Sequence, residues 1–110
     1  MTKMSELILR RGVDVTYRQV SRTFNDRGDE TESYMDTQKR CIIQISSDRE
    51  YFDKSGEPQV ADLTAFFDKD ETINIGDKIQ YNGDWYVIVD AVKEMPGFEK
   101  FWDVALKREL

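Results

Sequence analysis

The sequence predicts a small, mainly β protein: an antiparallel β-barrel of about six strands with a short N-terminal helix and long polar loops. Three observations indicate this fold. Several segments alternate apolar and polar residues with the period of a half-buried strand. An Asn-Gly pair between two apolar runs is typical of a tight β-hairpin. The chain has 110 residues, enough for one hydrophobic core, so residues 1–110 are expected to form a single domain whose closure removes exposed strand edges.

The helix is expected within residues 1–12. Met4, Leu7 and Ile8 follow the i, i+3, i+4 spacing of one helical face, and Gly12 stands where a helix typically stops. This apolar face must be covered, either by the same chain or by another subunit.

The first strand is expected at residues 13–24. Its apolar alternation changes phase near Arg18 and Gln19, which predicts a bulge or a bend in the strand. Residues 25–36 contain Asn, Asp, Gly, Glu and Ser with hardly an apolar side chain, so they are predicted to form a long polar loop. Residues 37–45 alternate again and are predicted to form a half-buried strand.

A second long polar loop is predicted at residues 46–59, where Tyr51 and Phe52 are the bulky apolar residues. A third strand is expected at residues 60–67, and a closing strand ends at Leu110. Loops of this length in so small a domain usually have a function.

The strongest local signal lies at residues 78–92. Asn82-Gly83 separates two apolar runs there and predicts a type I′ hairpin. The hairpin register places one apolar set on one face: Ile79, Tyr81, Tyr86 and Ile88. A second apolar set falls on the opposite face: Trp85, Val87, Val89 and Ala91. Because both faces are apolar, both must be covered; the core covers one, and the N-terminal helix or a neighbouring subunit covers the other.

The composition argues against an enzyme and against a general nucleic-acid binder. The chain has no histidine and one cysteine, Cys41, which removes the usual general base and the usual zinc ligands, so we predict no metal and no cofactor. Cys41 is expected to be a buried, inert thiol. Asp and Glu outnumber Lys and Arg by 22 to 16, a net charge of -6, which disfavours binding to phosphate backbones. No apolar stretch is long enough for a transmembrane helix.

One segment resembles a known protein family. Residues 73–88, with Gly76-Asp77-Lys78-Ile79 before the turn and Trp85-Tyr86-Val87 after it, are similar to the Gly-Asp-x-Ile, short turn, x-Tyr-x-Val hairpin of phage head-closure and head–tail joining (connector) proteins. The order of elements is similar too, since those proteins begin with a short helix and a Val-rich strand, like residues 13–17, and finish in a strand like residues 103–108.

The resemblance implies a virion structural protein, assembled in the cytoplasm of a bacterial host. Such a protein is a small β-barrel, monomeric when isolated, that forms a ring of identical copies below the portal and its adaptor, closes the packaged head and receives the tail. Its partners would be those proteins, with packaged DNA close by and no membrane or small-molecule substrate. A tail-completion or tail-terminator role is an alternative.

The resemblance also implies a loop that narrows the DNA channel. The best match in position is the second loop, with residues 25–36 as the next choice, and an acidic loop would let DNA pass without binding it. The alternative that both loops are simply solvated stays open. The predicted channel-loop residues are Ser46, Ser47, Asp48, Arg49, Glu50, Tyr51, Phe52, Asp53, Lys54, Ser55, Gly56 and Glu57.

Assembly contacts are expected on two apolar faces, that of the helix and the outward face of the hairpin, with Tyr51 and Phe52 as further contacts. The alternative is that the two faces pack on each other within one chain. The predicted contact residues are Met4, Leu7, Ile8, Trp85, Val87 and Val89.

A rival hypothesis is a small nucleic-acid-binding barrel. Its stacking and phosphate contacts would come from aromatic and basic residues on the strands, although the net charge opposes this. The residues concerned are Tyr17, Arg18, Arg22, Tyr81 and Trp85.

Overall fold

The computed structural model describes residues 3–45, 49–53, 55–93 and 100–109, and these ranges contain one helix and eight strands. The elements in chain order are α1 (Lys3–Arg11), β1 (Val13–Phe24), β2 (Glu30–Ile45), β3 (Glu50–Phe52), β4 (Pro58–Val60), β5 (Leu63–Asp68), β6 (Lys78–Tyr81), β7 (Asp84–Lys93) and β8 (Phe101–Arg108).

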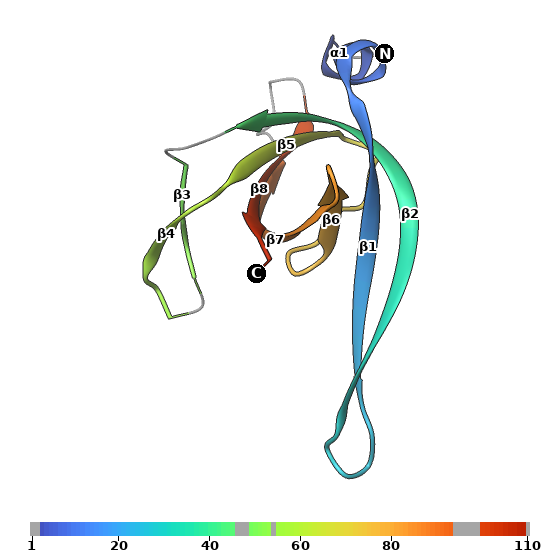
Figure 1. The fold of residues 1–110 in the computed structure, drawn as a ribbon, viewed down its shortest axis with the longest axis vertical. Helices are drawn as coiled ribbons and strands as arrows, with labels where there is room; N and C mark the ends of the chain where they lie inside the picture. Colours follow the sequence, from blue (N-terminus) through green and yellow to red (C-terminus); the bar gives the residue numbers. More distant parts are fainter. Residues whose placement is uncertain (1–2, 46–48, 54, 94–99, 110) are drawn as a thin grey trace.

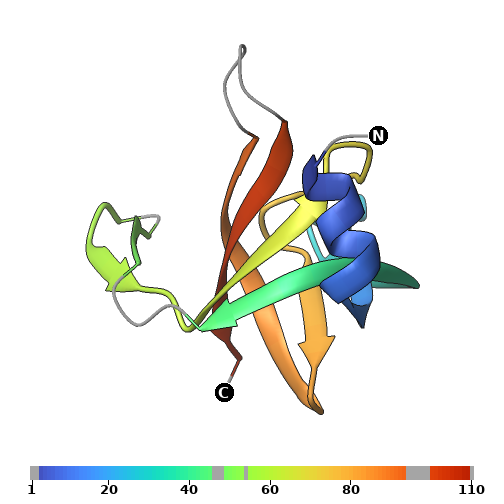
Figure 2. The ribbon, with the colours of Figure 1, turned by 90° about the horizontal axis from the view of Figure 1, so that it is seen from above.

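Six of these strands form a closed barrel, in the order β1-β2-β5-β8-β7-β6, and β6 pairs with β1 to close it. All pairs are antiparallel. Strands β3 and β4 form a separate two-stranded sheet that stands to one side of the barrel (Figures 1 and 2). The predicted barrel of about six strands with an N-terminal helix is therefore confirmed.

The core fills the barrel interior. Phe67, Ile79, Ile88 and Leu106 are fully buried, and the ring of Tyr17 meets Phe67 edge-on with centroids 6.3 Å apart. Such burial of large apolar side chains is the main source of stability in a small domain. Other buried members of the cluster are Val15, Cys41, Leu63, Ala65, Ile73 and Val104.

Cys41 has no exposed surface, as predicted for an inert thiol. Burial, with a smaller contribution from the charge of Asp14, raises the pKa of its thiol to about 12. The thiolate is the reactive form of cysteine, so the folded protein keeps this side chain unreactive near neutral pH.

The hairpin predicted at Asn82-Gly83 is confirmed. It joins β6 to β7, and both turn residues have positive φ, 52° and 83°, as a type I′ turn requires. Beyond the turn, β7 departs from the predicted alternation. A register shift lies between Ile88 and Asp90, so Ala91 packs against the core cluster. The prediction that Ala91 shares the outward face was therefore wrong.

Two features expected in the first third of the chain, a bulge in the first strand and a loop over residues 25–36, differ in the structure. β1 pairs with β2 in unbroken register from Val13 to Phe24, so the bulge, one of the two predicted outcomes, is absent. The change of phase in β1 marks the point where the strand leaves the barrel. Residues 25–36 are not one loop, because β2 begins at Glu30 and a short turn alone separates the strands. Both faces of this region are exposed, so no apolar periodicity revealed the strand.

The second predicted loop, residues 46–59, contains the small β3–β4 hairpin and is not irregular throughout. Of the residues predicted for this loop, Ser46, Ser47, Asp48 and Lys54 lie outside the described residues.

The helix packs against β2 and β5. Ile8 is buried there, and the backbone N–H of Gly12 donates to the carbonyl oxygen of Ile8 at 2.9 Å. A Cβ on Gly12 would lie 2.3 Å from that oxygen and 2.9 Å from the carbonyl oxygen of Cys41, so only glycine fits at this junction. Because α1 lies on β2 and β5, it does not cover Trp85. The prediction that the helix could cover the outward face of the β6–β7 hairpin was therefore wrong.

Candidate functional site

The most distinctive feature of the molecule is a long β-hairpin that projects from the barrel (Figure 1). β1 pairs with β6 only over Thr16–Arg18, and β2 pairs with β5 only from Cys41 onward. Beyond these points β1 and β2 pair only with each other. We call residues 19–35 the arm. Every residue from 21 to 38 is exposed, so the arm contributes no core of its own.

The arm ends in a well-defined turn. The side-chain oxygen of Asn25 accepts hydrogen bonds from the backbone N–H groups of Arg27 and Asp29, both at 2.9 Å, and its carbonyl oxygen accepts one from Gly28. Gly28 has φ of 83°, a conformation that glycine adopts at little cost. The tip is therefore fixed by local hydrogen bonds, although it is far from the core.

The two faces of the arm differ in chemistry. On one face Arg22 lies between Glu30 and Glu32, 3.3 Å from a carboxylate oxygen of each, and Phe24 and Tyr34 share this face by alternation. Exposed ion pairs of this kind contribute little to folding. The opposite face carries no charge, and its residues are Gln19, Ser21, Thr23, Thr31, Ser33 and Met35.

The root of the arm is held on the outside of the barrel by Arg18. Its guanidinium donates two hydrogen bonds to Asp36, at 2.8 and 3.0 Å, and it lies 4.1 Å from the ring centroid of Trp85 and 4.9 Å from that of Tyr34. The hydrogen bond from Arg18 holds the pKa of the Asp36 carboxyl below its usual value. Cation–π stacking and a two-pronged ion pair together fix the direction in which the arm leaves the barrel.

On the inside, Asp77 fixes the same root. Its carboxylate accepts a hydrogen bond from the hydroxyl of Tyr17 at 2.5 Å and one from the backbone N–H of Val20 at 3.0 Å. The backbone N–H of Asn74 in turn donates to the Tyr17 hydroxyl at 3.1 Å. Asp77 and Tyr17 are both buried, and burial, followed by the hydrogen bond to Asp77, raises the pKa of Tyr17. The pairing of β1 with β6 ends at Arg18. Beyond that point, Asp77 accepts the hydrogen bond from Val20 that a neighbouring strand would otherwise accept.

The β3–β4 hairpin borders a groove of about 560 Å³ on the barrel wall. Tyr51 and Phe52 lie on one side of the groove, and Ile75, Val87 and Val89 lie on the other. Phe52 is 72% exposed and Ile75 is 64% exposed, so part of the lining is open and apolar. The charged residues that also line the groove are Arg22, Asp53, Lys78 and Glu109. Of the predicted contact residues, Val87 and Val89 therefore come together with Tyr51 and Phe52, which are distant in sequence.

The hairpin is anchored to the barrel by Arg49. Its guanidinium pairs with Asp103 and lies 3.9 Å from Asp90. The backbone N–H of Ala61 donates to the carbonyl oxygen of Arg49 at 2.8 Å, and Lys107 Nζ donates to the carbonyl oxygen of Val60 at 3.1 Å. Several carboxylates lie in the rest of the hairpin: Glu50, Asp53 and Glu57.

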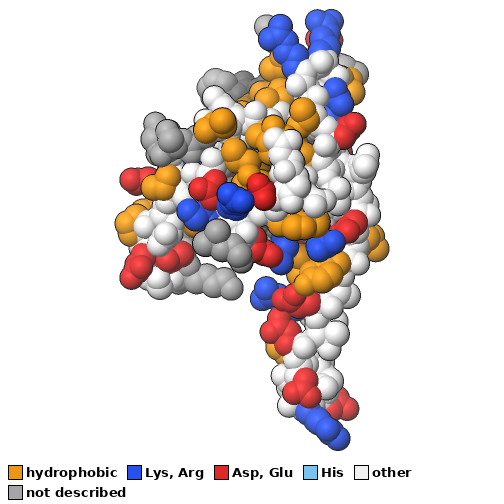
Figure 3. Space-filling model, viewed as in Figure 1, with side chains coloured by type: hydrophobic (Ala, Val, Ile, Leu, Met, Phe, Trp, Pro, Cys, Tyr) orange, Lys and Arg blue, Asp and Glu red, His pale blue; other side chains and the backbone are white. Residues whose placement is uncertain are grey.

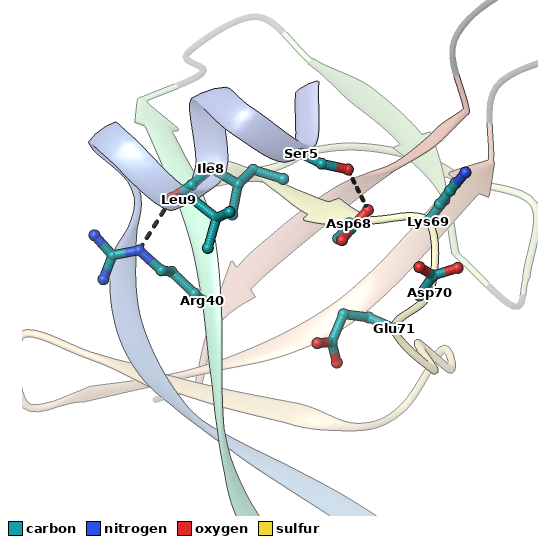
Figure 4. A pocket seen from close by; sticks show the side chains of 8 residues that line it. All are labelled: Ser5, Ile8, Leu9, Arg40, Asp68, Lys69, Asp70 and Glu71. Atoms are coloured by element: carbon teal, nitrogen blue, oxygen red, sulfur yellow. Dashed lines mark hydrogen bonds between the residues drawn. The ribbon is translucent and has the colours of Figure 1, made fainter. Parts of the chain in front are cut away.

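The third feature is the helix and the pocket beside it (Figure 4), which has a volume of about 460 Å³. The hydroxyl of Ser5 donates to Asp68 at 2.8 Å, and Arg40 Nε donates to the carbonyl oxygen of Ile8 at 3.0 Å. The described residues contain no group of three carboxylates, histidines or cysteines arranged to hold a metal ion. Nor do they include a helix long and apolar enough to cross a membrane.

The predicted contact residues are thus divided among different surroundings. Ile8 is buried and Met4 is half-buried, while Leu7 is 39% exposed. Trp85 is half-buried beneath Arg18. Residues 25–36 were the second choice for the channel loop, but the strands of the arm were missed because their composition resembles that of a loop. The signal that could have revealed the hairpin was the presence of Asn25 and Gly28 at the positions of a short turn.

The residues named for the nucleic-acid hypothesis are largely engaged within the chain. Tyr17 is buried, Arg18 is paired with Asp36 and stacked on Trp85, and Arg22 is paired with two glutamates. A stacking platform for bases needs exposed aromatic faces beside free cations. This arrangement does not favour that hypothesis.

Fold and site together define a class of protein by architecture: a small closed antiparallel barrel that carries a projecting, solvated hairpin. No protein-family model and no curated protein matches the sequence. Among solved structures, the fold is similar to that of the phage-like element PBSX protein xkdH from Bacillus subtilis. The TM-score is 0.54 at 15% sequence identity, and the likeness covers 91% of this chain and 97% of that chain. At this identity the likeness shows a common fold.

Proposed function

We propose that this chain is a structural protein of a tailed phage or prophage particle, in which a ring of identical copies joins the head to the tail. The observation that carries the proposal is the arm, whose two strands leave a closed barrel and, among the described residues, form β-ladder pairs only with each other. A two-stranded ribbon without a core is marginally stable in water. Such an arm would be stabilised by another protein that covers it: another subunit, a portal or adaptor protein, or a tail protein.

Two similarities support a phage particle as the setting. A solved structure with a similar fold is that of a protein of a phage-like element. Residues 73–88 resemble the hairpin of head–tail joining proteins, and Asp77 of that segment binds the root of the arm through Tyr17 and Val20. The residues that carry the resemblance are therefore the ones that position the projecting arm.

The proposed role is non-catalytic and consists of burying surface against other particle proteins, without a cofactor or a small-molecule substrate. For the DNA channel we propose the β3–β4 hairpin as the segment nearest to the passing DNA. It stands apart from the barrel (Figure 1) and carries Glu50, Asp53 and Glu57. In a chain of net charge -6, these carboxylates would repel the phosphates and keep DNA from adhering.

The test is deletion of the gene in the bacterium that carries it, followed by induction and electron microscopy of the particles. The proposal predicts separate heads and tails, with joining restored by the wild-type chain supplied from a plasmid. Normal, joined particles after deletion would refute it. Heads that lose their DNA would indicate head closure, whereas DNA-filled stable heads with tails of abnormal length would indicate the alternative tail-completion role.

A further inference from the structure

The two ends of the molecule carry opposite charge. Helix α1 lies at one end of the longest axis and the tip of the arm lies at the other (Figure 1), over an extent of 49 Å. α1 carries Arg10 and Arg11 in its last turn against Glu6 in its first. The tip, residues 22–32, contains two arginines against four acidic residues: Asp26, Asp29, Glu30 and Glu32. In Figure 3, Lys and Arg side chains gather at the helix end, whereas the arm carries Asp and Glu side chains together with basic ones, including a basic group at its very end.

The charges at the helix end are available for binding. Arg10 and Arg11 are exposed, and neither forms an ion pair among those that the described residues make. The helix dipole favours basic residues in the last turn of a helix. It explains their position, but not why they have no acidic partner among the described residues of a protein rich in acidic residues. They therefore form a local basic surface on a chain whose net charge is negative.

Each charged end also exposes apolar side chains. Leu9 is 57% exposed and Leu7 is 39% exposed beside the arginines of α1, and Phe24 is 69% exposed at the acidic tip. An exposed apolar residue ringed by charges of one sign matches a surface with an apolar residue ringed by the opposite sign. Because the two surfaces lie at opposite ends of the longest axis of the molecule (Figure 1), a single copy cannot bring its own tip to its own helix.

We propose that the tip of the arm of one copy docks on α1 of a second copy, with Phe24 against Leu7 and Leu9 and the tip carboxylates against Arg10 and Arg11. A contact between two different surfaces repeats from copy to copy, and it closes into a ring when the rotation between copies allows it. This inference rests on the ring of the proposed function and names the surfaces that build it. Its electrostatic part weakens with salt, because exposed charges are screened beyond about 10 Å at 0.1 M.

The experiment is disulfide trapping with the full chain at high concentration and low salt. Arg27→Cys places a thiol at the tip and Glu6→Cys places one on α1, one turn before Arg10, so the basic end and the tip carboxylates are kept. The native Cys41 is buried and does not compete. Under mild oxidation the doubly substituted chain is expected to give a ladder of multimers, while each single variant stays mostly monomeric.

Charge reversal supplies the matched control. Arg10→Glu with Arg11→Glu is expected to lower the yield of the ladder by about tenfold, as is Asp26→Lys with Glu30→Lys. Mixing a helix-reversed Glu6→Cys chain with a tip-reversed Arg27→Cys chain restores a heterodimer, because the signs again match. Far-ultraviolet circular dichroism verifies that each variant is folded.

Three results would overturn the inference. The first is a ladder whose yield does not respond to charge reversal. The second is cross-linking of Arg27→Cys alone as strong as that of the double variant, which would indicate tip-to-tip contact. The third is no ladder at all, which would assign the arm to a different protein. Joined particles after gene deletion would refute the proposed function instead, so the two failures are distinguishable.

Discussion

Phe67 and Phe24 belong to two regions of the chain, the barrel and the arm, which are stabilised in different ways. Phe67 lies in the barrel with no exposed surface, whereas Phe24 lies on the arm with 69% of its surface exposed. The barrel gathers its apolar side chains inside a closed ladder, so each strand is held on both edges. The arm continues two of those strands into solvent, where cross-strand pairs alone hold them. The barrel therefore supplies the stability of the fold, and the arm adds exposed surface to it.

The largest effect is expected from removing the same side chain in the two regions. Phe67→Ala should lower the free energy of unfolding by about 3–5 kcal/mol, since it leaves a cavity beside Tyr17. Phe24→Ala should change it by less than about 0.5 kcal/mol, as expected at an exposed site. Urea denaturation followed by tryptophan fluorescence measures both. Equal losses would mean that the arm shares the core of the barrel.

The next effect concerns the junction between the two regions. Asp77→Ala leaves the Tyr17 hydroxyl and the Val20 N–H without their acceptor, which should cost about 1–3 kcal/mol. Asp14→Ala is the matched control, because Asp14 is exposed and makes one peripheral ion pair with Arg40. Hydrogen exchange should also become faster at the amide of Val20 in Asp77→Ala. An unchanged exchange rate there would contradict the role given to Asp77.

The same junction predicts a dependence on alkaline pH. The pKa of Tyr17 is raised above its ordinary value of 10.0 by burial and by the hydrogen bond to Asp77, so the folded state keeps a proton that the unfolded state loses. The contribution of Tyr17 to stability should therefore be constant below the unfolded pKa and be lost as pH rises above 10.0. Tyr17→Phe should show a shallower decline over about pH 9 to pH 11.5. Identical slopes for the two proteins would exclude this linkage.

The smallest effect is expected from the charged face of the arm. Arg22→Ala removes ion pairs with Glu30 and Glu32 at a site where the arginine is 56% exposed, so the loss should stay below about 1 kcal/mol. Arg49→Ala, which removes a half-buried pair with Asp103, should cost more. Thermal unfolding of both variants at low and high salt would measure the two losses of stability. A larger loss of stability for Arg22→Ala than for Arg49→Ala would show that the arm stabilises the barrel.

The sequence revealed the barrel better than the arm, for physical reasons that particular residues illustrate. Asn82-Gly83 needed positive φ at both positions, and few other structures require that pair, so the β6–β7 hairpin was predicted correctly. The strand through Cys41 alternates because one face is buried. Residues 30–36 have no buried face, so their polar sequence resembled a loop although they form a strand.

The other features that the sequence did not predict depend on the tertiary structure. The register shift after Ile88 turns Ala91 inward, and no local pattern in β7 signals it. The groove between Phe52 and Val87 joins segments from two different hairpins. Asp77 lies in the segment whose pattern resembles a known hairpin, residues 73–88, but its hydrogen bond from Tyr17 spans 60 residues of sequence and depends on the folded barrel.

The most direct test of the division between barrel and arm is to remove the arm. Val20 donates its N–H to Asp77, so the N–H of Ser21 points across to its partner Ser33. Replacing residues 22–32 by Asn-Gly after this pair makes a short hairpin like the one that Tyr81 and Asp84 flank. The free energy of unfolding of this shortened chain should stay within about 1 kcal/mol of wild type, while head–tail joining in the deletion strain is lost. A shortened chain that does not fold, or one that still joins heads to tails, would contradict the account.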